Sequence, residues 1–87
     1  MYRSELERLM TLASVDIDAA CRGERIESLI TRCFDEHLEL SDLAGEAADA
    51  DDLATHDFYS QEASAWRSTA QVLRRMATPA RAHAGAA

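Results

Sequence analysis

The sequence contains little glycine and proline, few cysteines and no lysine. Its three glycines stand at positions 23, 45 and 85, too far apart to build a glycine-rich phosphate-binding loop. Two cysteines cannot form a disulfide framework, and neither Cys-x-x-Cys nor His-Glu-x-x-His occurs. No apolar run approaches membrane-spanning length. What remains is an alanine-rich chain with few helix breakers, which favours helix throughout.

Basic charge is scarce, and its distribution is uneven. The formal net charge is −7 over 87 residues, and all nine basic residues are arginines. An acidic excess of this size argues against direct binding to nucleic acid or to an anionic membrane surface. Between Cys33 and Trp66 the chain has ten carboxylates and neither arginine nor lysine. We therefore expect any partner to be a protein with a basic surface.

Hydrophobic spacing predicts an all-α fold, a three-helix antiparallel bundle in one domain over residues 1–78. The first helix begins at Ser4, whose spacing to Glu7 fits a capping box, and Gly23 ends it. The second runs over residues 24–49 and the third over residues 53–78. Residues 79–87 follow a Thr-Pro step and have little apolar content, so we expect a disordered C-terminal tail.

The second and third helices are predicted to pair as a hairpin. Folded antiparallel about residue 51 or 52, their apolar seams face each other, and large residues mostly meet small ones. The paired seam positions are Ala44 with Tyr59, Leu40 with Ala63, His37 with Trp66, Cys33 with Ala70, Ile30 with Leu73 and Ile26 with Ala77. The first helix lies back on this pair, with Leu6 near Leu40.

An acidic stripe is the leading candidate site. Five acids of the second helix step by four and three along the face opposite the seam, and acids at the following turn extend them. The candidate partner-binding residues are Asp35, Glu39, Asp42, Glu46, Asp49, Asp51 and Asp52. The other reading is an ordinary solvated helix face. Most arginines fall at the opposite end of the hairpin, and Arg3 and Arg8 are expected to reach the acidic end.

A rival site lies nearer the core. Cys33, Glu36 and His37 are close together on the second helix, and the hairpin register brings Glu62 near His37. Doubled across a dimer interface, these groups could form a metal- or redox-linked site. A buried His–Glu hydrogen bond is the structural alternative, and it is the commoner one in helical bundles. We expect no cofactor and no resident metal.

Surplus apolar residues predict an interface. Several lie outside the narrow helical seams, and a three-helix monomer has difficulty burying all of them. They are Leu12, Val15, Phe34, Leu38, Leu43, Phe58, Ala65, Val72 and Met76. A homodimer is one way to cover them.

No set of residues supports independent catalysis, so the sequence predicts a non-enzymatic protein-binding module. It would act as a small acidic inhibitor, adaptor or regulator, and a narrower version blocks a nucleic-acid-binding partner by charge mimicry. Reduced cysteines and the lack of a signal peptide lead us to expect a cytoplasmic location. The metal- or redox-linked bundle remains the alternative.

Overall fold

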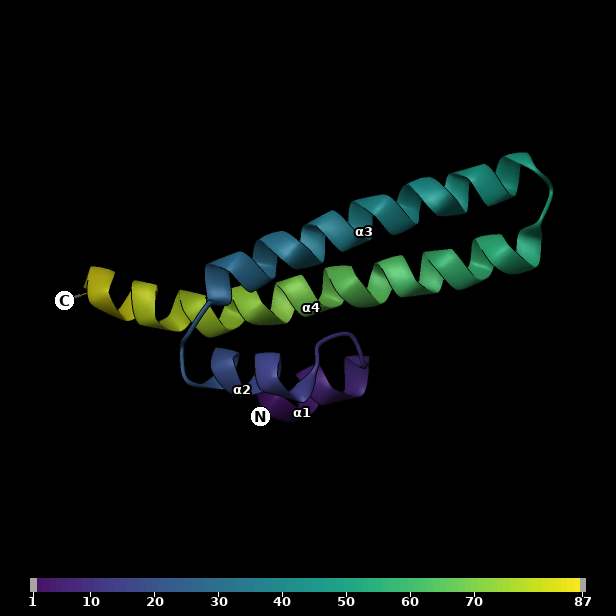
Figure 1. The fold of residues 1–87 in the computed structure, drawn as a ribbon. Helices are drawn as coiled ribbons and strands as arrows, with labels where there is room; N and C mark the ends of the chain where they lie inside the picture. Colours follow the sequence, from purple (N-terminus) through teal and green to yellow (C-terminus); the bar gives the residue numbers. More distant parts are fainter. Residues whose placement is uncertain (1, 87) are drawn as a thin grey trace.

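The computed structural model describes the backbone of residues 2–86 and the side chains of residues 2–77. It contains four helices in this range, α1 (Tyr2–Leu9), α2 (Ser14–Cys21), α3 (Ile26–Asp49) and α4 (Leu53–Ala86), and no strand. The all-α class is confirmed. The expected count of three helices is wrong, because the first predicted helix is two short ones (Figure 1).

The break between α1 and α2 falls at Met10. This residue adopts a left-handed conformation, with φ of 55°, which ends α1. In a continuous first helix, Leu12 would lie off the apolar face that packs against the hairpin. With the break, Leu12 is 7% exposed and Met10 is 88% exposed. The Thr11 hydroxyl also comes within 2.6 Å of the buried Thr69 hydroxyl on α4. Tertiary packing therefore overrides the single-helix pattern.

Gly23 ends α2 as predicted, but α3 begins two residues later than expected. Gly23 has a φ of 77°, and its N–H donates to the Ala20 carbonyl while that of Glu24 donates to Ala19. This pair of bonds is the Schellman arrangement that closes many helices. Arg25 is also left-handed, with φ of 57°, so regular helix starts at Ile26.

The hairpin turn is built from two aspartates. Asp51 has a φ of 60°, and its N–H donates to Ala48 while the Asp52 N–H donates to Ala47, a second Schellman closure. Asp52 then caps α4, because its carboxylate accepts the Thr55 N–H at 3.2 Å. The predicted turn at residues 51–52 and the predicted start of the third helix at residue 53 are both confirmed.

The core lies at one end of an elongated molecule of 54 × 25 × 18 Å. Figure 1 shows α3 and α4 as a long hairpin, with α1 and α2 packed on one side of its half farthest from the turn. We call residues 2–21, which form α1, α2 and the link between them, the N-terminal layer. Its residues Leu6, Leu12 and Ile17 form one cluster with Leu29, Cys33, Ala70, Val72 and Leu73 of the hairpin. The expected placement of Leu6 near Leu40 is wrong, since Leu40 is not part of this cluster.

The turn-side half of the hairpin has no third layer. We call residues 34–65 the distal arm. Within it, only Ala44 and Ala63 are fully buried, whereas many seam positions are half-buried. A three-helix bundle therefore describes only the opposite half of the molecule.

The backbone of α4 continues as helix to Ala86, beyond the end expected at Thr78. Side chains from residue 78 onward lie outside the described part of the chain. The helix end expected at Thr78 is wrong, whereas the disorder expected over residues 79–87 stays a prediction.

Candidate functional site: an unpaired acidic arm

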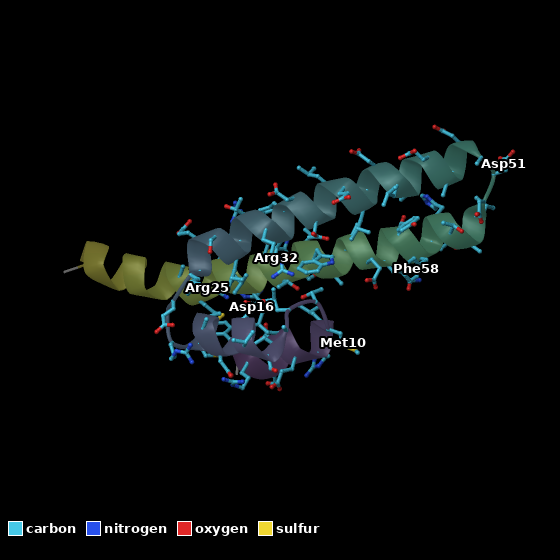
Figure 2. All side chains as sticks on the ribbon, in the orientation of Figure 1. Met10, Asp16, Arg25, Arg32, Asp51 and Phe58 are labelled. Atoms are coloured by element: carbon cyan, nitrogen blue, oxygen red, sulfur yellow. The ribbon has the colours of Figure 1, made fainter. Side chains whose placement is uncertain are left out.

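All seven predicted partner-binding residues are exposed on the distal arm. Five lie along the outer face of α3 and two at the hairpin turn, as the three-and-four spacing predicts. They are Asp35, Glu39, Asp42, Glu46, Asp49, Asp51 and Asp52. Figure 2 shows Asp51 at the tip of the hairpin. Of the labelled residues, it lies farthest from the N-terminal layer. The structure thus places these residues on one projecting element.

No ion pair neutralises the ten carboxylates of the distal arm among the side chains of residues 2–77. Every ion pair in that range lies at the opposite end. Arg3 pairs with Glu7 and Asp18, so the expectation that Arg3 reaches the acidic end is wrong. Arg8 lies beside Leu9, Ser68 and Arg75, which also places it away from the distal arm.

The opposite end is held together by charge. Asp16 of α2, whose side chain is 13% exposed, pairs with Arg25 and, at 3.2 Å, with Arg32. Glu5 of α1 pairs with Arg75 of α4 at 2.8 Å. In these three pairs the N-terminal layer supplies the acids and the hairpin side supplies the arginines, whereas Arg3 pairs within the layer.

Asp51 and Asp52 have structural roles that the stripe residues lack. Asp51 closes α3 in a left-handed conformation, and Asp52 caps α4. Hydrogen bonds from Thr55 hold the pKa of the Asp52 carboxyl below its usual range. The five acids on α3 are therefore better candidates for partner binding than the two at the turn.

The rival metal or redox site does not assemble. Cys33 is fully buried in the core, so it cannot reach an interface with a second copy. Burial raises the pKa of its thiol to about 11, which keeps it protonated at neutral pH. Glu62 is exposed, so its expected inward orientation is wrong. Within the described residues no three His, Cys, Asp or Glu side chains are grouped to hold a metal ion.

His37 makes a structural hydrogen bond, but with a different partner from the expected Glu62. Its Nδ1 lies 2.9 Å from the Ala63 carbonyl oxygen on α4, and His56 Nδ1 lies 2.9 Å from the Ala44 carbonyl oxygen on α3. Because a carbonyl only accepts, each Nδ1 carries the proton and donates. The two imidazoles therefore join the helices where the apolar core is thin.

This reciprocal arrangement reflects a short repeat that the sequence analysis missed. His37, Ser41 and Ala44 recur at identical spacing as His56, Ser60 and Ala63, and a small residue, Gly45 or Ser64, follows each set. The antiparallel pairing brings the two copies together around an open groove of about 360 Å³. The repeated His-x-x-x-Ser-x-x-Ala spacing was the available signal. No carboxylate lines the groove, so it offers no acid–base pair.

The predicted surplus of apolar surface is partly absorbed by the core. Leu12 and Val72 are buried, while Phe34, Leu43, Ala65 and Met76 are half-buried. Val15, Leu38 and Phe58 remain exposed, at 67%, 61% and 59%. Leu53, at the start of α4, is 67% exposed. Three of these four large side chains lie on the distal arm, beside its unpaired acids.

A projecting helical hairpin that combines unpaired charge with exposed apolar side chains is typical of a protein-binding module. The comparisons with known proteins agree with this class. Residues 1–80 match the TY-Chap C-terminal domain family, and the chain belongs to that family. Membership indicates a chaperone-like module whose partner is another protein.

The remaining comparisons add no relatives. No curated protein and no solved structure matches the chain. In the described part of the chain, no helix combines the length and the apolar character needed to cross a membrane.

Proposed function

We propose that this domain is a non-enzymatic, chaperone-like module that binds a basic surface of a partner protein through its distal arm. The observation that supports this most is the set of ten carboxylates without an ion pair among the described residues. Proteins ordinarily intersperse charges of both signs along exposed helices. Here the opposite end of the same hairpin pairs its charges, whereas the arm leaves its acids available.

The test compares two variants with equal net charge. The arm variant combines Asp35→Asn, Glu39→Gln, Asp42→Asn and Glu46→Gln. The control variant combines Glu7→Gln, Asp18→Asn, Glu24→Gln and Glu27→Gln at the opposite end. Each removes four of the negative charges, which changes the net charge from −7 to −3. Proteins recovered from extract of the source cells are identified by mass spectrometry, after circular dichroism has shown that both variants fold.

We expect the arm variant to lose its basic partner and the control to retain it. Added salt should weaken recovery by the unmodified domain, because exposed charges are screened within about 10 Å at 0.1 M ionic strength. Equal recovery by the arm variant and the unmodified domain would show that the acidic arm is not the binding element.

A narrower form of the proposal is inhibition by charge mimicry. The five acids on the outer face of α3 are spaced roughly 5 Å apart along the axis, at about 1.5 Å per residue. One DNA strand presents a phosphate about every 3.4 Å. The stripe could therefore occupy a groove that normally binds nucleic acid. In that case, duplex DNA should displace the domain from its recovered partner; simultaneous binding of both would contradict mimicry.

Self-association is a further proposal for the exposed leucines. Leu38 and Leu53 are 61% and 67% exposed, and a homodimer would cover them. Light scattering coupled to size-exclusion chromatography should then give twice the 9.6 kDa chain mass. A Leu38→Ser, Leu53→Ser double variant should return to the monomer mass. A monomer mass for the unmodified domain would contradict this proposal.

A further inference from the structure

The N-terminal layer covers only part of a continuous surface on the hairpin. On α3, one row of residues steps by four and three and includes Leu29, Cys33, Glu36, Leu40, Leu43 and Ala47. On α4 the matching row includes Val72, Thr69, Ala65, Glu62, Phe58 and Thr55. This mean spacing of about 3.5 residues keeps each row on one side of a supercoiled helix pair. The two rows thus form one face along the whole hairpin.

Burial along this face declines toward the turn. Under the N-terminal layer, Leu29, Cys33 and Thr69 are 4%, 0% and 0% exposed. Leu40 and Leu43, farther along α3, are only half-buried. Phe58, on α4, is 59% exposed. Met10 marks the end of the N-terminal layer nearest the turn, and Phe58 lies beyond it along α4 (Figure 2).

The charge on this face changes sign at the same place. Under the N-terminal layer the hairpin contributes three arginines. Arg25 and Arg32 pair with Asp16 of the layer, and Arg75 pairs with Glu5. On the distal arm the same face contributes Glu36 and Glu62, without an ion pair among the described side chains. An element that continues the layer toward the turn must therefore bring apolar side chains and positive charge.

Resting on the proposed function, we propose that the distal arm binds a basic amphipathic helix of its partner as a third layer in line with α1 and α2. Its apolar side lies on Leu40, Leu43 and Phe58, and its Lys or Arg side chains pair with Glu36 and Glu62. From Glu36 to Ala47 the seat measures about 17 Å, or roughly three turns at 1.5 Å per residue. Binding completes the bundle that the chain itself builds only at its other end.

A second copy of this chain does not fit the seat. Its own distal arm has the same ten carboxylates, and its N-terminal layer contributes acids at Glu5, Glu7, Asp16 and Asp18. Like charges brought together at an interface oppose association. The opposite face of the hairpin includes Leu38 and the groove lined by Gly45 and Ser64, and no carboxylate lines that groove.

The test uses two synthetic peptides of equal composition, each 14 residues of Leu, Lys and Ala. In one, leucines recur at three-and-four spacing, which gives an apolar side; in the other, the order is scrambled. Isothermal titration measures both against the full chain. Two serine variants distinguish the faces, because Phe58 and Leu38 are almost equally exposed, at 59% and 61%. Helical spacing places Phe58 on the side of the N-terminal layer and Leu38 on the opposite side.

We expect the amphipathic peptide to bind at least tenfold more tightly than the scrambled one. Phe58→Ser should weaken binding of the amphipathic peptide about tenfold, which is the loss of affinity expected when a large apolar contact is removed. Leu38→Ser should leave its affinity unchanged. Because both side chains are exposed, neither substitution threatens folding, and circular dichroism checks this.

Equal binding of the two peptides would overturn the helix proposal but leave charge-driven binding by the arm intact. Equal loss with Leu38→Ser and Phe58→Ser would also overturn it, because the seat would then not be the face in line with the N-terminal layer. The proposed function has its own contradicting result, which is unchanged recovery of the partner by the arm variant with four neutralised acids.

Discussion

At the scale of single residues, the chain accepts a strained conformation at the hairpin turn. Asp51 is left-handed, with φ of 60°, at a position where glycine is the usual residue. Asp51→Gly should therefore stabilise the domain by about 0.5–1 kcal/mol. The measurement is the free energy of unfolding in urea. Glu39→Gly, in the middle of α3, is the control and should destabilise by about 0.5–1 kcal/mol. A loss of stability with Asp51→Gly would contradict this account of the turn.

The cap on α4 should make stability depend on pH at the acidic end. Hydrogen bonds from Thr55 lower the pKa of Asp52 from its ordinary value of 3.8, so folding favours the ionised form. The stabilisation that ionised Asp52 gives to the folded domain is fully present above pH 3.8. It is lost as the pH falls through the pKa of Asp52 in the folded domain, which is lower than 3.8. The stability difference between the unmodified domain and Asp52→Ala should accordingly shrink below about pH 4. A constant difference between pH 2 and pH 7 would contradict the cap.

The two cysteines should differ sharply in reactivity. Cys21 is exposed, whereas Cys33 is buried and its pKa is raised to about 11. Iodoacetamide at pH 8 should alkylate Cys21 in the folded domain and reach Cys33 only after unfolding, as followed by mass spectrometry. Comparable rates in the folded protein would show that the core around Cys33 opens readily.

Residue-level features could be predicted only where a local signal decides them. Gly23 at the end of α2 and the Asp51-Asp52 turn were both evident from residue type. Glu62 was wrongly placed inside, because helical spacing locates a residue on a side of its helix but not its depth. The backbone carbonyl partners of His37 and His56 could not be predicted, since any carbonyl across the interface is an equally good acceptor.

At the scale of helices, the hairpin was predictable and the N-terminal layer was not. The long seams of α3 and α4 repeat their spacing over many turns, so the pattern is strong. The first 21 residues form a short pattern that a single helix also satisfies. What favours the break is tertiary: Leu12 enters the core, and Thr11 reaches Thr69 on α4.

The half-covered hairpin predicts two levels of local stability. Amides near Leu29 and Leu73 lie beneath the N-terminal layer, whereas those near Leu43 and Phe58 belong to a helix pair with no third layer. Native-state hydrogen exchange should show at least tenfold weaker protection in the second group, equivalent to about 1.4 kcal/mol. Uniform protection along α3 and α4 would mean that the arm is as stable as the covered half.

At the scale of the whole molecule, charge and packing change together along one axis. One end has the apolar cluster, the N-terminal layer and the ion pairs, and the other has exposed acids and Phe58. The sequence predicted this separation of charge, because the arginine-free stretch is visible without a structure. The sequence could not show that the N-terminal helices stop short of the turn, because that depends on the interruption of the first helix at Met10.

The central claim is that the distal arm is the binding element and that its face in line with the N-terminal layer receives a basic helix. The most direct test is a titration of the ¹⁵N-labelled domain with the amphipathic Leu/Lys/Ala peptide, followed by NMR. We predict that the largest shifts fall near Leu40, Leu43 and Phe58, with little change near Leu38 or within α2. Shifts concentrated around Leu38 and Ser64, or spread evenly over both ends, would contradict the account.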